Sequence, residues 1–310
     1  MKRCYLFPGQ GAQYPGMAKD FYEASGNVRS LFEEASDVTG MDLRRLLFEG
    51  SEEELKATDK TQVAVTLANC SSSIYLKEHG ISADGAAGHS LGEYSALWEA
   101  GVLDNKSLFA IVKARGELMQ KASRNLDSSH GQAGMAAVVG LAYEDVVKVL
   151  ENLKGEEIYL ANYNSPIQVV VAGTAAGLDK GENAFDEAGA MKYVRLKVSG
   201  PFHTPLLEEA RDGLEEVLKN HAYSNPVKPV YANVTGKEVK SGDEAKELCV
   251  RQVVSPVLWV EEEQTILDAG YDQILESGPG KILSGLWKSF HRAMKCQQAG
   301  TVEKAAALLG

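Results

Sequence analysis

The pentapeptide Gly88-His89-Ser90-Leu91-Gly92 constrains this chain more than any other stretch, because it separates a strand pattern from a helical one. Residues 84–87 are a weak strand candidate, and a helix is predicted from the pentapeptide to about residue 100. Glycine on both sides of the serine is typical of a sharp strand-to-helix turn, where larger side chains would clash. Free N–H groups at the helix start would face a reacting oxygen. The pattern indicates a nucleophilic serine, and a purely structural glycine turn is the alternative.

The pattern of strands and helices predicts an α/β protein with a second unit inside the first. Strand and helix patterns alternate on both sides of Ser90, which favours a parallel sheet with helices on both faces. Residues 128–198 instead follow the order β-α-β-β-α-β, the ferredoxin-like arrangement. There, residues 162–166 are predicted as a turn, and the alternation in 192–198 predicts a strand with Val194, Leu196 and Val198 buried. We therefore expect an α/β-hydrolase-like domain (1–127 and 199–310) with an inserted ferredoxin-like domain (128–198).

Composition excludes several classes of function. Lys and Arg number 32 against 43 Asp and Glu, and a net charge of −11 argues against nucleic acid as the main ligand. The apolar runs are far shorter than the ~20 residues of a membrane span, and the first residues lack a signal-peptide pattern, so we expect a cytoplasmic protein without a membrane partner. The four cysteines are scattered, and no phosphate-binding glycine loop is present, so no metal and no cofactor are expected.

A serine hydroxyl is a weak nucleophile and needs a base. His89 adjoins the serine, but a turn of this kind is expected to point it away. His203 lies in a proline-flanked loop directly after the predicted inserted domain, and this position makes it the candidate base. A solvated loop histidine is the alternative. The histidines of the chain are His79, His89, His130, His203, His221 and His291.

Arg115 stands where an apolar side chain is expected. The helical period places it on the same face as Leu108, Ile111, Val112 and Met119. A guanidinium there stays charged and needs an anion. An internal Asp or Glu and the carboxylate of a substrate are the two candidates.

Short segments spread along the whole chain occur in a specific order and spacing. They are residues 7–13, 88–94, 115–116, 161–166, 200–203, 250–252 and 278–280. Together they resemble the malonyl-CoA:acyl carrier protein transacylases of fatty acid synthesis, to which the acyltransferase domains of polyketide synthases are related.

This resemblance implies an acyl transfer in two steps. Ser90 takes the malonyl group from malonyl-CoA with His203 as general base, and the thiol of acyl carrier protein then takes it from the serine. Backbone N–H groups of Gln10 and Leu91 hold the oxyanion, and a main-chain carbonyl beside the position of Gln252 orients the imidazole in place of a triad carboxylate. The implied substrate-binding residues are Arg115, Met119, Asn162, Asn164, Gln168 and Phe202.

Two other functions fit parts of the sequence. A serine esterase or thioesterase shares the turn and the histidine, but it needs no inward arginine. A non-catalytic binding module would use the same cleft without forming an acyl-enzyme. An acidic carrier protein would need a local basic patch on this acidic chain. Two stretches are candidates: Lys281, Lys288, Arg292 and Lys295, with the last three on one helix face, and Lys192, Arg195 and Lys197.

Overall fold

A four-stranded parallel sheet lies at the centre of the larger part of the molecule. The computed structural model describes residues 1–129 and 131–309. The strands follow the order β10-β9-β1-β2 and every neighbouring pair is parallel, which confirms the predicted sheet. They are β1 (Arg3–Phe7), β2 (Gly85–Gly88), β9 (Gln273–Glu276) and β10 (Cys296–Gln298).

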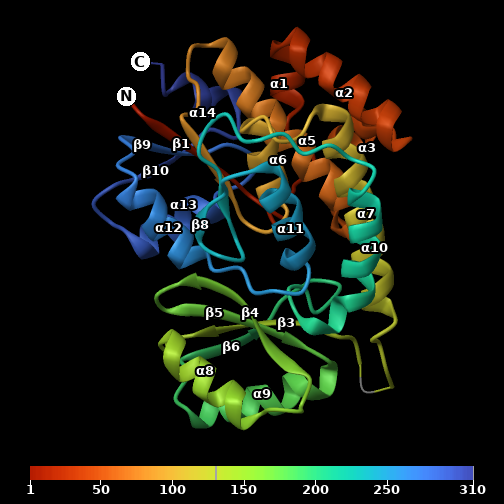
Figure 1. Cartoon of the computed structure of the whole chain (residues 1–310), viewed down its shortest axis with the longest axis vertical. Helices are drawn as coiled ribbons and strands as arrows, with labels where there is room; N and C mark the ends of the chain where they lie inside the picture. The colour runs from red at the N-terminus through yellow and green to blue at the C-terminus, as the bar shows by residue number, and fades with distance from the viewer. Residues whose placement is uncertain (130, 310) are drawn as a thin grey trace.

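Helices cover both faces of this sheet because its inner strand β1 is apolar and buried from Cys4 to Phe7. Tyr5 and Phe7 of β1 join one buried cluster, whereas Cys4 and Leu6 join another that contains Trp259. Both faces of the sheet are therefore shielded from water. Helices surround the sheet in the upper part of Figure 1. They are α1 (Lys19–Ala24), α2 (Gly26–Thr39), α3 (Leu43–Glu49), α4 (Glu52–Lys56), α5 (Thr58–Glu78), α6 (Gly92–Glu99), α7 (Asn105–Arg124), α10 (Glu208–Leu218), α11 (Gly242–Gln252), α12 (Trp259–Asp268), α13 (Ile282–Phe290) and α14 (Val302–Ala306).

A second, antiparallel sheet forms the lower part of Figure 1. Its strands follow the order β4-β5-β3-β6, and along the chain the elements run β-α-β-β-α-β as predicted. The elements are β3 (Gly134–Val139), α8 (Tyr143–Asn152), β4 (Ile158–Ser165), β5 (Gln168–Gly173), α9 (Ala175–Glu187) and β6 (Lys192–Arg195). A short helix η1 (Pro205–Leu207) and the two-stranded sheet of β7 (Tyr231–Ala232) and β8 (Lys237–Glu238) complete the fold.

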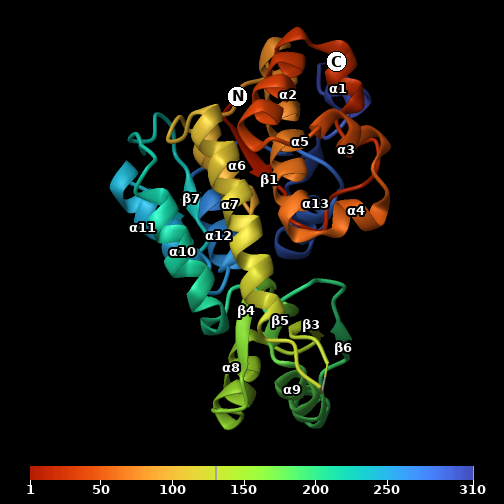
Figure 2. The same ribbon diagram turned by 90° about the vertical axis from the view of Figure 1, so that its right-hand side faces the viewer.

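The two faces of the antiparallel sheet pack against different parts of the molecule. Residues such as Val138 and Val171 pack with α8 and α9 in a cluster of their own, whereas Ala137 and Val170 join the main core. Figure 2 shows α7 and α10 running side by side from the larger part toward this sheet, and the two helices are in contact. The second face of the small sheet lies toward the larger part of the molecule, where α12 and α13 contact β4.

Two local predictions are wrong. Residues 162–165 belong to β4 instead of a turn, because two register shifts, between Leu160 and Asn162 and between Tyr163 and Ser165, let the strand continue. In β6 the side chain that packs inward is Tyr193, beside Phe185, while Val194 is 47% exposed. The strand ends at Arg195, but Leu196 and Val198 beyond it pack inward as predicted and line the cleft.

No helix in the described parts of the chain is both long enough and apolar enough to cross a membrane.

Candidate active site

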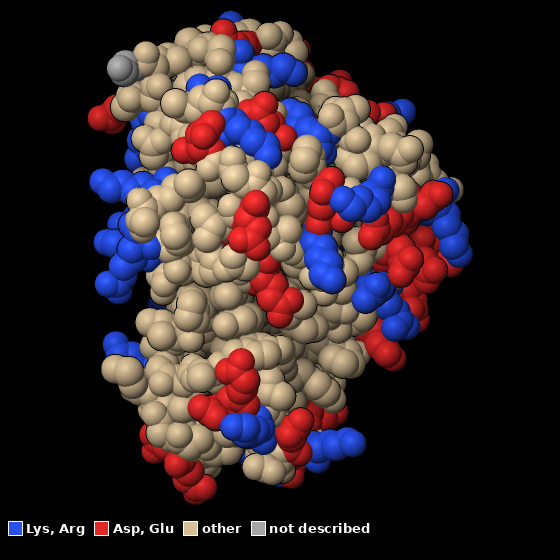
Figure 3. Space-filling view, turned by 60° about the vertical axis from the view of Figure 1, so that its left-hand side comes forward, with Lys and Arg blue, Asp and Glu red and all other residues tan. Residues whose placement is uncertain are grey.

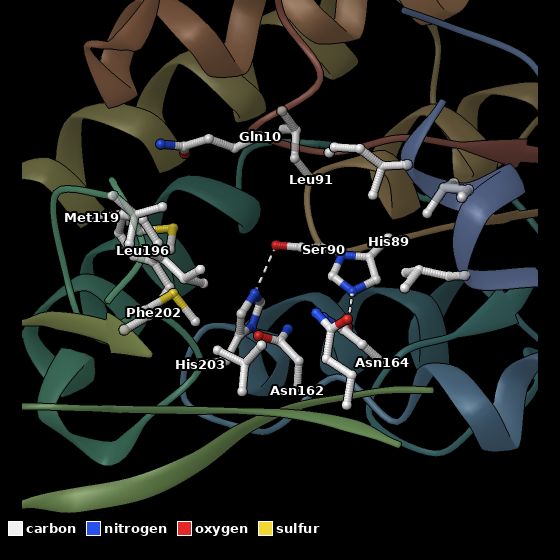
Figure 4. Close-up of a pocket in the computed structure, with 18 of the residues that line it drawn as sticks. Gln10, His89, Ser90, Leu91, Met119, Asn162, Asn164, Leu196, Phe202 and His203 are labelled. Carbon is white, nitrogen blue, oxygen red and sulfur yellow. Dashed lines mark hydrogen bonds between the residues drawn. The ribbon is translucent and has the colours of Figure 1, made fainter. Parts of the chain in front are cut away.

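A cleft opens between the carboxyl ends of β1 and β2 and the strands β4 and β5 of the antiparallel sheet (Figure 4). It gathers side chains from segments far apart in the sequence. All the predicted site residues except Gln252 line it: Gln10, Ser90, Leu91, Arg115, Met119, Asn162, Asn164, Gln168, Phe202 and His203.

The turn that carries Ser90 is sharp and strained. Ser90 has φ 53°, in the left-handed region that non-glycine residues rarely adopt. A Cβ added to Gly88 would lie 2.1 Å from the carbonyl carbon of Gly92, and one added to Gly92 would lie 1.9 Å from the carbonyl oxygen of Phe7. Only glycine fits at either position. A left-handed conformation costs about 1–3 kcal/mol, and it persists where the surroundings enforce it.

Ser90 and His203 form a hydrogen-bonded dyad. The Ser90 hydroxyl lies 2.7 Å from Nε2 of His203, and the Nδ1 atom of the same ring lies 2.8 Å from the carbonyl oxygen of Gln252. A carbonyl only accepts, so Nδ1 carries the proton and Nε2 offers a lone pair to the serine hydroxyl. The carbonyl belongs to Gln252 itself.

Burial keeps the imidazole neutral. His203 is 2% exposed, and burial, followed by the positive charge of Arg115, lowers its pKa to about 3. A neutral imidazole can accept the serine proton. His203 is itself in a left-handed conformation, with φ 63°, so both members of the dyad have unusual backbones.

Two backbone N–H groups next to Ser90 are unused. Within the described residues, no protein acceptor takes the N–H of Gln10 or of Leu91. The loop after β1 can approach the turn because residue 9 is glycine: a Cβ there would lie 2.5 Å from the carbonyl oxygen of His89. The two N–H groups are therefore free to receive an oxyanion.

Arg115 is 1% exposed and has no acidic partner in the described residues. Its Nη1 donates to Oε1 of Gln62 at 2.8 Å and its Nη2 to Oε1 of Gln252 at 3.0 Å, while Nε has no partner. The ring of Tyr94 lies 5.4 Å from the guanidinium carbon. The internal carboxylate considered as one alternative is thus not found. Two neutral amides fix the guanidinium, which acts on the Glu93 carboxyl only at a distance, so no carboxylate pairs with it directly at the cleft wall.

A buried network behind the dyad was not predicted. The side-chain nitrogen of Gln252 donates to the carbonyl oxygen of Ser90 at 3.1 Å and to Glu93 at 2.6 Å. Burial raises the pKa of Glu93 to about 7. Gln252 therefore contacts both dyad residues and Arg115. No sequence pattern joins Gln62, Glu93, Asn233 and Gln252, because their contacts span many elements.

As predicted, His89 does not face the Ser90 hydroxyl. It lines another part of the cleft, where its Nε2 lies 2.8 Å from Oδ1 of Asn164 (Figure 4). Burial lowers its pKa. It fixes Asn164 on β4, while Met119, Leu196 and Phe202 gather at the opposite end of the cleft in Figure 4. Phe202 is 7% exposed.

The basic stretch near the C-terminus forms a hollow next to this cleft. Helix α13 ends at Phe290, so Arg292 and Lys295 do not continue a helix face as predicted. The side chains still surround one depression, which we call the basic hollow: Lys281, Ser284, Lys288, His291, Arg292 and Lys295. In the described residues none of its lysines or arginines makes an ion pair. Basic side chains gather at the left edge of Figure 3.

The second basic candidate is weaker. Arg195 of β6 pairs with Asp179 at 2.6 Å, so part of its charge is already compensated.

Comparisons with known proteins agree with this geometry. Residues 4–306 match the acyl transferase domain family. The malonyl CoA-acyl carrier protein transacylase of Bacillus subtilis (strain 168) is 38% identical over 296 residues, covering 95% of this chain and 92% of that protein. The protein of the same name from Escherichia coli (strain K12) is 37% identical over 286 residues, covering 92% and 91%.

Solved structures give the same result. A malonyl-transacylase in complex with its type II PKS acyl-carrier protein superposes with a TM-score of 0.93 at 36% identity, covering 100% of this chain and 99% of that one. A malonyl-transacylase structure from Streptococcus pneumoniae has a TM-score of 0.93 at 36% identity, with 99% of both chains covered.

Proposed function

The chain belongs to the malonyl-CoA:acyl carrier protein transacylase family, and we propose that it moves a malonyl group from malonyl-CoA to the phosphopantetheine thiol of acyl carrier protein. The reaction supplies the elongation unit of fatty acid synthesis. It is an acyltransferase reaction that needs no cofactor.

The first half-reaction is an attack by Ser90 on the thioester carbonyl. His203 takes the hydroxyl proton at Nε2, 2.7 Å away, as the new C–O bond forms. The N–H groups of Gln10 and Leu91 stabilise the oxyanion; one such donor is typically worth about 2.7–4 kcal/mol. The C–S bond then breaks, and the imidazolium returns the proton to the departing CoA thiolate. Malonyl-Ser90 remains.

The second half-reaction runs the same steps in reverse order. His203 accepts the proton of the carrier thiol, the thiolate attacks the ester, and Ser90 recovers its proton. Asn162, Asn164 and Gln168 line the side of the cleft where the pantetheine arm would enter, and Phe202 and Met119 line the acyl end.

The observation that carries this proposal is the buried Arg115 in the same cleft as the dyad. Two neutral amides hold the guanidinium, and no described carboxylate forms an ion pair with it. The free carboxylate of malonyl supplies the missing anion, in a bidentate pair. An esterase or thioesterase would have no use for this charge, and a binding module would have no use for a hydrogen-bonded serine–histidine pair.

Mass spectrometry of the intact protein tests the proposal. Incubation with malonyl-CoA should add one malonyl group at Ser90, and later addition of acyl carrier protein should remove it. The Ser90→Ala variant should gain no mass. Rapid loss of the group to water without carrier protein would favour a thioesterase, and an unmodified parent protein would favour a binding module.

We also propose a division of the chain into two domains. The strand order β4-β5-β3-β6 with α8 and α9 on one face supports a ferredoxin-like subdomain inserted at residues 128–198 into an α/β-hydrolase-like domain of residues 1–127 and 199–310. A cytoplasmic location remains a prediction.

A further inference from the structure

Asn233 reaches the rear of the Ser90 turn from the end of β7. It is fully buried, and its Oδ1 accepts the N–H of Ser90 at 2.7 Å. Its Nδ2 donates to the carbonyl oxygen of Gly88 and to Oε2 of Glu262, each at 2.8 Å. One amide thus holds the turn at Gly88 and at Ser90 together.

The direction of this amide is determined by its partners. A reversed amide would set Nδ2 against the Ser90 N–H, which is a donor, and Oδ1 against the carbonyl oxygen of Gly88, which is an acceptor. Glu262, fully buried on α12, adds a second acceptor for Nδ2. The backbone N–H of Asn233 donates to Glu93 at 3.2 Å, so the main chain is held as well.

The contact matters because Ser90 is held in a conformation that it would not adopt alone. Of the described non-glycine residues, Ala18, Ser90, Glu157 and His203 have positive φ. Such backbones persist where their surroundings enforce them. In the Ser90 turn, Asn233 accepts its hydrogen bond from the backbone N–H of the strained residue itself.

We propose that Asn233 is a positioning residue that holds Ser90 in its reactive geometry. Because its Oδ1 takes the Ser90 N–H, that N–H is not available to the oxyanion, which leaves the N–H groups of Gln10 and Leu91. Asn233 does not line the cleft and does not touch the acyl group. The inference rests on the proposed acyl transfer at Ser90.

The rate at which a fluorophosphonate labels Ser90 measures the reactivity of the serine without using malonyl-CoA. Ser90 Oγ forms the P–O bond, fluoride leaves, and His203 takes the proton, so the labelling rate depends on the dyad and needs no pairing of a substrate carboxylate with Arg115. Two variants remove the amide: Asn233→Ala, and Asn233→Leu, which keeps the same number of side-chain heavy atoms in the same branched arrangement. We expect labelling at least tenfold slower and a kcat for malonyl loading about 10- to 100-fold lower, with KM within about threefold, as for a slightly misplaced nucleophile.

Two further variants separate positioning from general stability. Asn233→Asp keeps an acceptor for the Ser90 N–H but sets its second oxygen against Oε2 of Glu262, so it is combined with Glu262→Gln, whose amide can donate to that oxygen. The double variant should restore labelling to within about threefold of the parent rate. Tyr271→Phe removes a buried hydrogen bond to Tyr231, 3.0 Å long, without touching the turn, and should be labelled at the parent rate.

The outcomes are distinct. Labelling of folded Asn233→Leu at the parent rate would overturn the proposal. If neither apolar variant folds, the double variant Asn233→Asp/Glu262→Gln decides, since a loss beyond threefold would contradict a role for the Ser90 contact. A parent protein that reacts with the fluorophosphonate but takes no malonyl group would refute the proposed function alone.

Discussion

Replacing Arg115 by alanine should remove malonyl specificity while preserving the dyad. The guanidinium is 1% exposed and is held by the side-chain oxygens of Gln62 and Gln252. The bond that orients His203 comes from the main-chain carbonyl of Gln252, which the substitution leaves in place. The variant should therefore still form an acyl-serine.

The expected magnitude follows from the charge pair that malonyl loses. Removing one partner of a buried, hydrogen-bonded ion pair costs about 2–5 kcal/mol, which is roughly 30- to 4,000-fold in kcat/KM for malonyl-CoA. Acetyl-CoA brings no carboxylate and should lose far less. It can even gain, because the positive charge of Arg115 lowers the pKa of His203 and its removal makes the imidazole a stronger base.

The assay compares the rates of malonyl and acetyl loading of Ser90 by rapid quench and intact-mass measurement. Arg115→Lys is the matched variant: it keeps the charge but loses the planar fork, so its malonyl rate should fall between parent and alanine. The melting temperature of each variant shows how much stability is lost when the side-chain oxygens of Gln62 and Gln252 no longer accept a hydrogen bond from Arg115. An equal loss for malonyl and acetyl would refute the reasoning and make Arg115 structural.

Four further results are expected. Phe202→Ser should narrow the preference for malonyl over methylmalonyl, because the ring at the acyl end would overpack an added methyl by about 1–3 kcal/mol; an unchanged ratio would place specificity elsewhere. Reversing the charge of Lys288 and Arg292 in the basic hollow should raise the KM for carrier protein and weaken its salt dependence, with malonyl loading from CoA unchanged; carrier kinetics like the parent's would place docking on another surface. With the pKa of His203 near 3 in the free enzyme, kcat/KM for malonyl loading should stay level from about pH 8 down to pH 5, and an acid limb near pH 6.5 would contradict this. The same depressed pKa means that, as the pH falls, His203 is protonated in the unfolded chain before it is protonated in the folded protein. The free energy of unfolding should therefore fall as the pH drops below about 6.5, and it should fall less in His203→Gln.

The sequence by itself determined the elements whose signal is local. The apolar run in β1, the glycines on both sides of Ser90 and the β-α-β-β-α-β order each depend on neighbouring residues, and the structure contains them. Arg115 was also found from a local signal, since a charge on an apolar helix face stands out within a few turns. The roles of Gln10, Leu91 and Gln252 came from family resemblance, because backbone groups leave no mark in side-chain chemistry.

Only the tertiary structure decided what surrounds these residues. Gln252 contacts Ser90, His203 and Arg115 from three directions, and Asn233 reaches the serine turn from a strand end 143 residues away. Such contacts have no period and no fixed spacing, so no pattern in the chain announces them. The bulges of β4 and the inward turn of His89 depend in the same way on packing against other elements. The sequence therefore specified which groups react, and the packing of distant segments specified what holds them in place.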